Sequence, residues 1–132
     1  MKKILLATTL LILTSMVFAQ KATKLNIVYF HAKNRCPTCI SIEENTKKTL
    51  NTYFAAQLKD GTIKFQVLDV SEVKNERIVE KYKAEGSSLF LTSLNGKKET
   101  ITDLTNFAFS YSRYQADKFI AGLKAEIEKT LK

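Results

Sequence analysis

The sequence predicts an α/β fold in which helices cover both faces of a mixed four-stranded sheet. Segments rich in β-branched and aromatic residues alternate along the chain with segments of helical periodicity. In addition, Asn95-Gly96 separates two strand-like segments, as in a tight β-hairpin. The first two crossovers predict parallel strands, and the hairpin adds an antiparallel edge strand.

The expected first strand precedes the only two cysteines, and the expected first helix begins between them. Leu25–His31 is rich in β-branched and aromatic residues, which is typical of a buried strand. A helix is expected from Pro37 to about Leu58, because proline is favoured in the first helical turn. Its expected apolar stripe consists of Ile42, Thr46, Leu50, Tyr53 and Leu58.

The second strand and second helix follow Asp60-Gly61, which ends the first helix. Ile63–Val70 alternates between polar and apolar residues, as a strand does. Ser71 is expected to cap a helix that runs to about Lys83. This helix would place Val73, Val79 and Tyr82 on one side.

The last part of the chain predicts the hairpin and a final helix. Leu89–Leu94 and Lys98–Asp103 are the expected strands of the hairpin. The aromatic segment 107–114 has helical character. A clear helix then begins at Asp117, and its apolar face consists of Phe119, Ile120, Leu123, Ile127 and Leu131.

Residues 1–19 have the layout of a secretory signal peptide. Lys2 and Lys3 precede an uncharged apolar run, and Val17 and Ala19 are small residues at the positions that a signal peptidase recognises. The run is shorter than the ~20 residues that span a bilayer. We therefore expect cleavage after Ala19, a single domain over residues 20–132, no stable membrane insertion after cleavage, and a periplasmic or secreted location.

The chain is basic, with a formal net charge of +8. Its lysines are spread along the sequence and alternate with glutamates, which favours a solvated lysine-rich face. No basic run is interleaved with stacking aromatic residues. We therefore expect no nucleic-acid partner, and we expect a monomer.

Cys36 and Cys39 carry most of the functional information. A disulfide persists in an exported protein, but so small a loop removes little entropy from the unfolded chain. At the start of a helix, unpaired N–H groups and the helix dipole lower the pKa of a thiol, and Arg35 adds a nearby positive charge. Cys39 lies one turn further on, at a more buried position. This order predicts Cys36 as the attacking thiol and Cys39 as the resolving thiol.

Cys36-Pro37-Thr38-Cys39, placed after the first core strand, resembles the active-site motif of the thioredoxin-like superfamily. The similarity in element order covers roughly residues 24–131. Three segments also resemble small exported proteins described as nitrophenyl-compound reductase subunits: YFHAKNRCPTC, VEKYKAEGSSLFL and DLTNFAFSYSR. The resemblance implies thiol–disulfide exchange with a partner protein that carries a thiol or a disulfide, with Pro37 and Thr38 tuning the reduction potential and with no cofactor.

Three positions depart from the pattern of that superfamily. Arg35 stands where a tryptophan is usual, and Tyr29 stands where many members bury an aspartate. In Gly86-Ser87-Ser88-Leu89, Ser88 replaces a proline whose peptide bond is cis. Because a non-proline cis bond costs roughly 2.5–4 kcal/mol, we expect a trans bond. We also expect Ser87 and Ser88 to pack against the cysteine motif.

Several alternatives remain open at the site. The Cys36–Cys39 disulfide can be purely structural, or the chain can be a non-catalytic redox-partner subunit of a larger reductase. A metal-binding module is a further alternative, in which His31 is the only obvious third ligand, although zinc usually takes three or four protein ligands. His31 is otherwise expected to form local hydrogen bonds or to act as an acid–base partner.

Two further groups of residues have both a structural and a functional interpretation. Glu43 and Glu44 are expected to be solvated, with proton relay to Cys39 as the alternative. The aromatic cluster that contains Phe107 and Tyr111 is expected to pack in the core. Alternatively, Phe107 and Tyr111 line a groove for a partner protein or an aromatic ligand.

Overall fold

The computed structural model describes residues 21–132, so the expected signal peptide lies outside the described residues. The elements alternate between strands and helices, in the order that the sequence predicts. They are β1 (Leu25–His31), α2 (Pro37–Tyr53), α3 (Ala55–Lys59), β2 (Ile63–Asp69), the 3₁₀ turn η1 (Val73–Asn75), α4 (Glu76–Tyr82), β3 (Ser88–Asn95), β4 (Lys98–Asp103), α5 (Thr105–Tyr111) and α6 (Ala116–Leu131).

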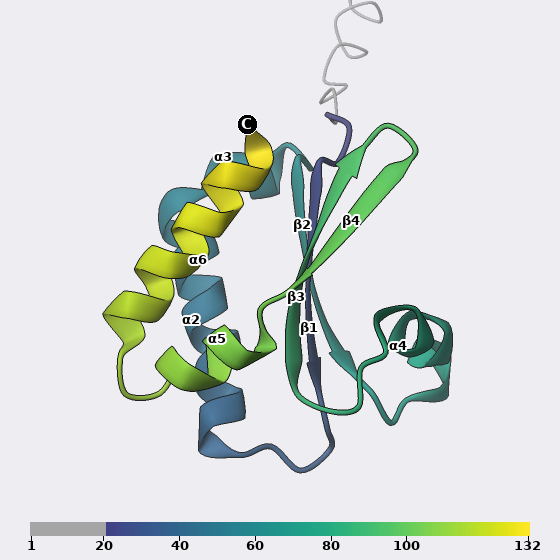
Figure 1. Ribbon diagram of the computed structural model, residues 1–132, viewed down its shortest axis with the longest axis vertical. Coiled ribbons are helices and arrows are strands. Elements are labelled where there is room, and N and C mark those ends of the chain that lie inside the picture. The colour runs from purple at the N-terminus through teal and green to yellow at the C-terminus, as the bar shows by residue number, and fades with distance from the viewer. Residues whose placement is uncertain (1–20) are drawn as a thin grey trace, which may run out of the picture.

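The four strands form one mixed sheet with the order β2-β1-β3-β4 (Figure 1). β1 runs parallel to β2 and antiparallel to β3, and β4 pairs with β3 as the second strand of the hairpin. The prediction that the second crossover makes parallel strands is therefore wrong. The seven residues of α4 span only about 10 Å, whereas a strand of seven residues is about 23 Å long. The helix is too short to bring the chain back to the end of the sheet where β1 and β2 begin. β3 therefore starts at the end where β2 finishes, opposite Phe30, and runs antiparallel to β1.

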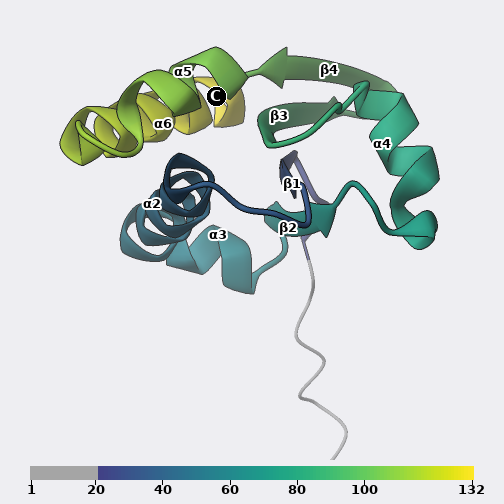
Figure 2. The ribbon, with the colours of Figure 1, turned by 90° about the horizontal axis from the view of Figure 1, so that it is seen from below.

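Helices cover both faces of the sheet, as predicted. α2, α3, α5 and α6 lie on one side, and α4 lies on the other (Figure 2). β1 contributes to both cores, because Leu25, Ile27 and Tyr29 face the larger group of helices while Val28 and Phe30 pack with α4. A central strand that is buried on both faces needs an almost continuous apolar run, which explains its composition.

The first helix ends earlier than predicted. Phe54 leaves the helical conformation with φ −132° and ψ 22°, and the short α3 follows it. The ring of Phe54 is 4% exposed and joins the core, whereas Tyr53, which was expected on the apolar stripe, is 48% exposed. A chain that continued as one helix would keep the direction of α2. The break instead buries Phe54.

The helix between β2 and β3 also begins later than predicted. Ser71 does not cap it; the Ser71 hydroxyl and backbone N–H both donate to Oδ1 of Asp69, at 2.6 and 2.8 Å. This turn at the end of β2 is followed by η1 and then by α4. Tyr82 is buried as expected, whereas Val73 is 85% exposed and so does not share its buried side.

The hairpin and the final helix agree with the sequence prediction. Asn95 pairs with Lys98 across the turn, and Gly96 takes a left-handed φ of 61°, which glycine adopts without steric strain. α6 buries Phe119, Leu123 and Ile127 against the sheet and α2. Within residues 21–132, no helix has both the length and the apolar character needed to cross a membrane.

Candidate redox site

Cys36 and Cys39 form a disulfide at the start of α2, with their Cα atoms 5.0 Å apart. Cys36 is the N-cap of this helix, and its extended backbone leads into Pro37 at the first helical position. The backbone N–H of Cys39 donates to Sγ of Cys36 at 3.1 Å. A cysteine sulfur thus occupies the place that a serine, threonine or aspartate oxygen usually takes at a helix start.

The two sulfur-bearing residues differ in exposure. Cys36 is exposed, whereas Cys39 is 6% exposed. Because a helix N-terminus stabilises an anion, this position favours the thiolate form of a reduced Cys36. The arrangement agrees with the expected geometry, and the division into attacking and resolving thiols stays a prediction.

Tyr29 lies directly behind the motif. Its ring is fully buried in the larger core, and its hydroxyl donates to the carbonyl oxygen of Cys39 at 2.6 Å. The strand position at which the resemblance implies an aspartate is thus filled by a group that bonds to the backbone of the motif. The sequence gives no signal for this contact, since it joins β1 to α2 across the loop.

Arg35 and Glu43 form an ion pair beside the motif, with Nη2 of Arg35 2.6 Å from Oε2 of Glu43. The two atoms are close, but they are not aligned as a hydrogen bond, and Nε of Arg35 has no hydrogen-bond partner. The Glu43 side chain is only 13% exposed, so the prediction of a solvated Glu43 is wrong, whereas Glu44 is exposed. The cause is the position of Glu43 one turn after Cys39, on the side of α2 that Arg35 reaches.

The charges around Glu43 keep its carboxylate ionised. Burial raises the pKa of Glu43, but the hydrogen bond from Lys47 and the pairing with Arg35 outweigh it and leave the pKa below its usual range. For Arg35, burial lowers the pKa, and the interactions with Glu43 and Tyr29 more than compensate. Both partners are therefore charged at neutral pH.

His31 ends β1 and makes local contacts. Its Nδ1 lies 3.0 Å from the carbonyl oxygen of Ala32, and it is the register partner of Asp69 on β2. In the part of the chain that the structure describes, no three histidine, cysteine, aspartate or glutamate side chains are grouped so as to hold a metal ion. The structure thus supplies no third ligand to the metal hypothesis, which stays a prediction.

The Ser87–Ser88 peptide bond is trans, as expected, since residues 21–132 contain no cis bond. Ser88 is the register partner of Phe30, so its side chain lies on the α4 face of the sheet, opposite to α2. Its hydroxyl donates to the carbonyl oxygen of Gly86 at 3.0 Å. The hydroxyl proton is therefore used within the loop, and a role for Ser87 or Ser88 beside the cysteines stays a prediction.

Phe107 and Tyr111 lie on α5 and are both partly buried against the larger core. The Phe107 ring stacks on Phe119, with centroids 5.5 Å apart, and its Cζ would be 2.6 Å from a Cβ added at Gly122. The Phe107 ring thus packs between α5 and α6. The exposed aromatic side chains of this region are Phe109 and Tyr114, and the proposed partner groove stays a prediction.

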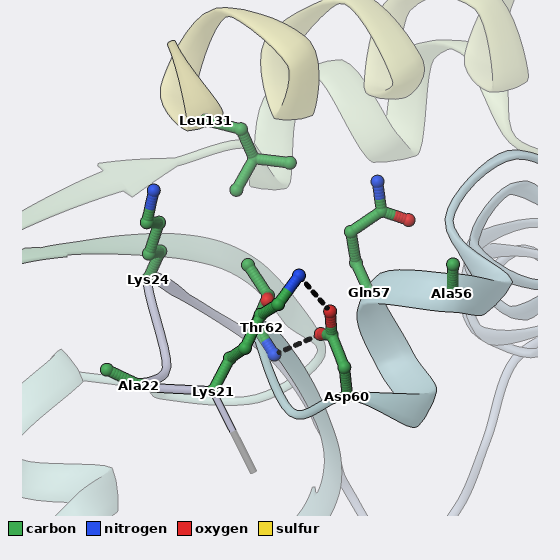
Figure 3. A pocket seen from close by; sticks show the side chains of 8 residues that line it. All are labelled: Lys21, Ala22, Lys24, Ala56, Gln57, Asp60, Thr62 and Leu131. Atoms are coloured by element: carbon green, nitrogen blue, oxygen red, sulfur yellow. Dashed lines mark hydrogen bonds and ion pairs between the residues drawn. The ribbon is translucent and has the colours of Figure 1, made fainter. Parts of the chain in front are cut away.

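A shallow pocket lies at the other end of the sheet, before β1 and β2 begin (Figure 3). Lys21 pairs with Asp60 at 3.1 Å, and the backbone N–H of Thr62 donates to Oδ1 of Asp60 at 2.9 Å. The cysteine motif follows the opposite end of β1. This pocket is therefore separate from the disulfide.

No protein-family model matches the chain, and no curated protein matches it. Among solved structures, a thioredoxin from Thermus thermophilus has a TM-score of 0.53 and 15% identity, and the match covers 88% of this chain and 83% of the thioredoxin. Thioredoxin-2 of the malaria parasite, a component of its protein secretion machinery, has a TM-score of 0.47 and 20% identity over 80% of this chain and 85% of its own. A malarial protein has a TM-score of 0.45 and 20% identity over 76% of this chain and 97% of its own.

The similarity to the Thermus protein concerns the fold, because 15% identity says nothing further. It extends over most of both chains and agrees with the mixed sheet described above. The chain therefore has a thioredoxin-like fold, and its Cys36-Pro37-Thr38-Cys39 motif forms a disulfide at the start of the first helix after the first strand.

Proposed function

We propose that this chain is an exported thiol–disulfide oxidoreductase that exchanges its Cys36–Cys39 disulfide with partner proteins. One observation carries the proposal: Sγ of the exposed Cys36 accepts the N–H of Cys39 at a helix N-terminus. An attacking thiolate is stabilised by this placement, because the N–H groups and the dipole of the helix N-terminus favour an anion.

In the reductive direction, the Cys36 thiolate attacks one sulfur of a partner disulfide. That S–S bond breaks, and the other partner sulfur leaves as a thiolate. Cys39 then loses its proton to solvent and attacks Sγ of Cys36, which releases the second partner thiolate. The Cys36–Cys39 bond forms, and two electrons pass to the partner. The oxidative direction is the reverse sequence.

Turnover of a protein disulfide tests the activity. With insulin as substrate and dithiothreitol as reductant, we expect the protein without residues 1–19 to accelerate reduction and Cys36→Ser to abolish the acceleration. After dithiothreitol has been removed, Cys39→Ser is expected to accumulate a mixed disulfide with insulin through Cys36. A rate no higher than that of dithiothreitol alone would contradict the proposal and would favour a non-catalytic redox-partner subunit.

Export is a separate part of the proposal, and residues 1–19 support it by their composition. Expression of the full chain in a bacterium with a periplasm is expected to yield a protein that begins at Gln20 in the periplasmic fraction. Mass spectrometry of the intact protein reads this terminus. A full-length protein that stays in the cytoplasm would contradict export without affecting the exchange activity.

A further inference from the structure

An ion pair between Arg35 and Glu43 forms a second bridge between the residues that flank the Cys36–Cys39 disulfide. Arg35 directly precedes Cys36, and Glu43 lies one turn after Cys39 on α2. Their side chains are 27% and 13% exposed, and Nη2 of Arg35 is 2.6 Å from Oε2 of Glu43. A partly buried pair interacts more strongly than an exposed one, because less solvent screens it.

This bridge lies against the motif itself. Cζ of Arg35 lies 5.8 Å from the centroid of the Tyr29 ring, and the hydroxyl of the same ring bonds to the carbonyl oxygen of Cys39. Lys47 contacts Glu43 from the next turn of α2. Of the other acidic groups near this end of the sheet, Asp69 on β2 has a lowered pKa, chiefly through hydrogen bonds from Ser71 and to a smaller extent through the charges of His31 and Lys33.

We propose that Glu43 is a positioning residue that sets the acidity of the Cys36 thiol by pairing with Arg35. An unopposed guanidinium on the residue that precedes Cys36 would favour the Cys36 thiolate, and the carboxylate of Glu43 cancels part of that charge. The Arg35 charge therefore acts less on Cys36 than the sequence predicts. The inference rests on the proposed function, since it concerns the thiolate that would attack the partner.

A pair of opposite single substitutions tests this role. The ultraviolet absorbance of the thiolate, followed against pH in the Cys39→Ser background so that Cys36 is the remaining thiol, gives the pKa of Cys36. We expect Glu43→Gln to lower this pKa by about 0.5–1, because the positive charge of Arg35 is then unopposed. Arg35→Gln is expected to raise it by a similar amount. The double variant is expected to lie close to the wild type, because the two effects cancel.

Glu44→Gln is the matched control. It removes the same charge from the next residue of α2, where the side chain is exposed. We expect a much smaller change in the Cys36 pKa than for Glu43→Gln. Equal changes in these two variants, or changes of the same sign for Glu43→Gln and Arg35→Gln, would overturn the proposal.

Two features keep the test decisive. If Glu43→Gln does not fold, Glu43→Asp keeps the charge but shortens its reach to Arg35, and we expect a smaller fall in the Cys36 pKa; no fall would contradict the proposal. The measurement uses no partner protein. A failure of this inference is therefore distinct from a failure of disulfide turnover, which is measured with insulin.

Discussion

The hydroxyl of Tyr29 donates a hydrogen bond of 2.6 Å to the carbonyl oxygen of Cys39, and so joins the central strand to the cysteine motif. This contact joins the fully buried ring of β1 to the first turn of α2. The motif is thus held from behind by the core, while Cys36 faces solvent.

Tyr29→Phe tests how much this hydrogen bond contributes. The ring stays in place and one hydrogen bond is lost, so we expect the free energy of unfolding to fall by about 0.5–1.5 kcal/mol. Denaturant unfolding of the oxidised protein measures it. Tyr53→Phe, which removes a hydroxyl from a half-exposed ring, is the control and is expected to have no effect. A Tyr29→Phe protein as stable as this control would show that the bond is energetically neutral.

The two cysteines are expected to react at different rates after reduction. Cys36 is exposed and accepts an N–H bond at a helix start, whereas Cys39 is 6% exposed. Iodoacetamide at neutral pH should therefore modify Cys36 first, since the accessible thiolate is the reactive form. Peptide mapping by mass spectrometry identifies the modified residue. Faster modification of Cys39 would reverse the assignment of attacking and resolving thiols.

Asp60 is expected to shape the stability of the protein in acid. Hydrogen bonds from the Thr62 side chain and backbone, with the Lys21 pair, hold the pKa of Asp60 at about 2, below its ordinary value of 3.8. Because the folded-state pKa is lowered, the ionised group stabilises the fold above about pH 4, and this contribution is lost as the pH falls towards 2.

Asp60→Asn removes this titration. Its stability, measured by denaturant unfolding, should therefore fall less steeply than that of the wild type between about pH 4 and pH 2. Glu44→Gln, which removes an exposed carboxylate from α2, is the control. If the Asp60→Asn curve runs parallel to that of the wild type over this range, Asp60 does not carry the acid dependence.

The ring of Phe107 lies so close to Gly122 that no side chain is expected to fit at position 122. A Cβ at position 122 would lie 2.6 Å from Cζ and 2.7 Å from Cε2 of Phe107, and that ring is held between Phe119 and Tyr111. We expect Gly122→Ala to lower the free energy of unfolding by about 1–3 kcal/mol, despite the better helix propensity of alanine.

The double variant Phe107→Leu with Gly122→Ala identifies the cause. A smaller side chain at position 107 leaves room for the added methyl group. Gly122→Ala should then cost less in the Phe107→Leu background than in the wild type, and a double-mutant cycle measures the difference. Additive effects of the two substitutions would show that the close contact is not the reason for the glycine.

Local patterns predicted most of the elements, because each element carries its own periodicity. The apolar run Leu25–His31, the Asn95-Gly96 turn and the stripe of α6 led to strand, hairpin and helix with little error. The direction of β3 was predicted wrongly, as parallel to β1. The observed direction depends on the length of α4. The sequence predicted a longer helix that begins after Ser71, but Ser71 bonds to Asp69 and does not cap a helix.

Of the candidate site, the sequence predicted only the features that depend on neighbouring residues in the chain. The spacing of Cys36 and Cys39 and the proline between them are sequential features, and they placed the disulfide at a helix start. The Tyr29–Cys39 bond and the Arg35–Glu43 pair depend on how β1, the loop and α2 come together. Glu43 lies four residues after Cys39, but this spacing alone does not distinguish a partly buried acid from the exposed Glu44 beside it.

The reduction potential of the Cys36–Cys39 couple tests the proposed exchange activity most directly. Equilibration of the protein with mixtures of reduced and oxidised glutathione, followed by quantification of both protein forms, gives the value. An exchange-active disulfide should lie between about −120 and −270 mV, the range of known oxidants and reductants of this kind. A potential below about −300 mV, typical of structural disulfides, would contradict the account.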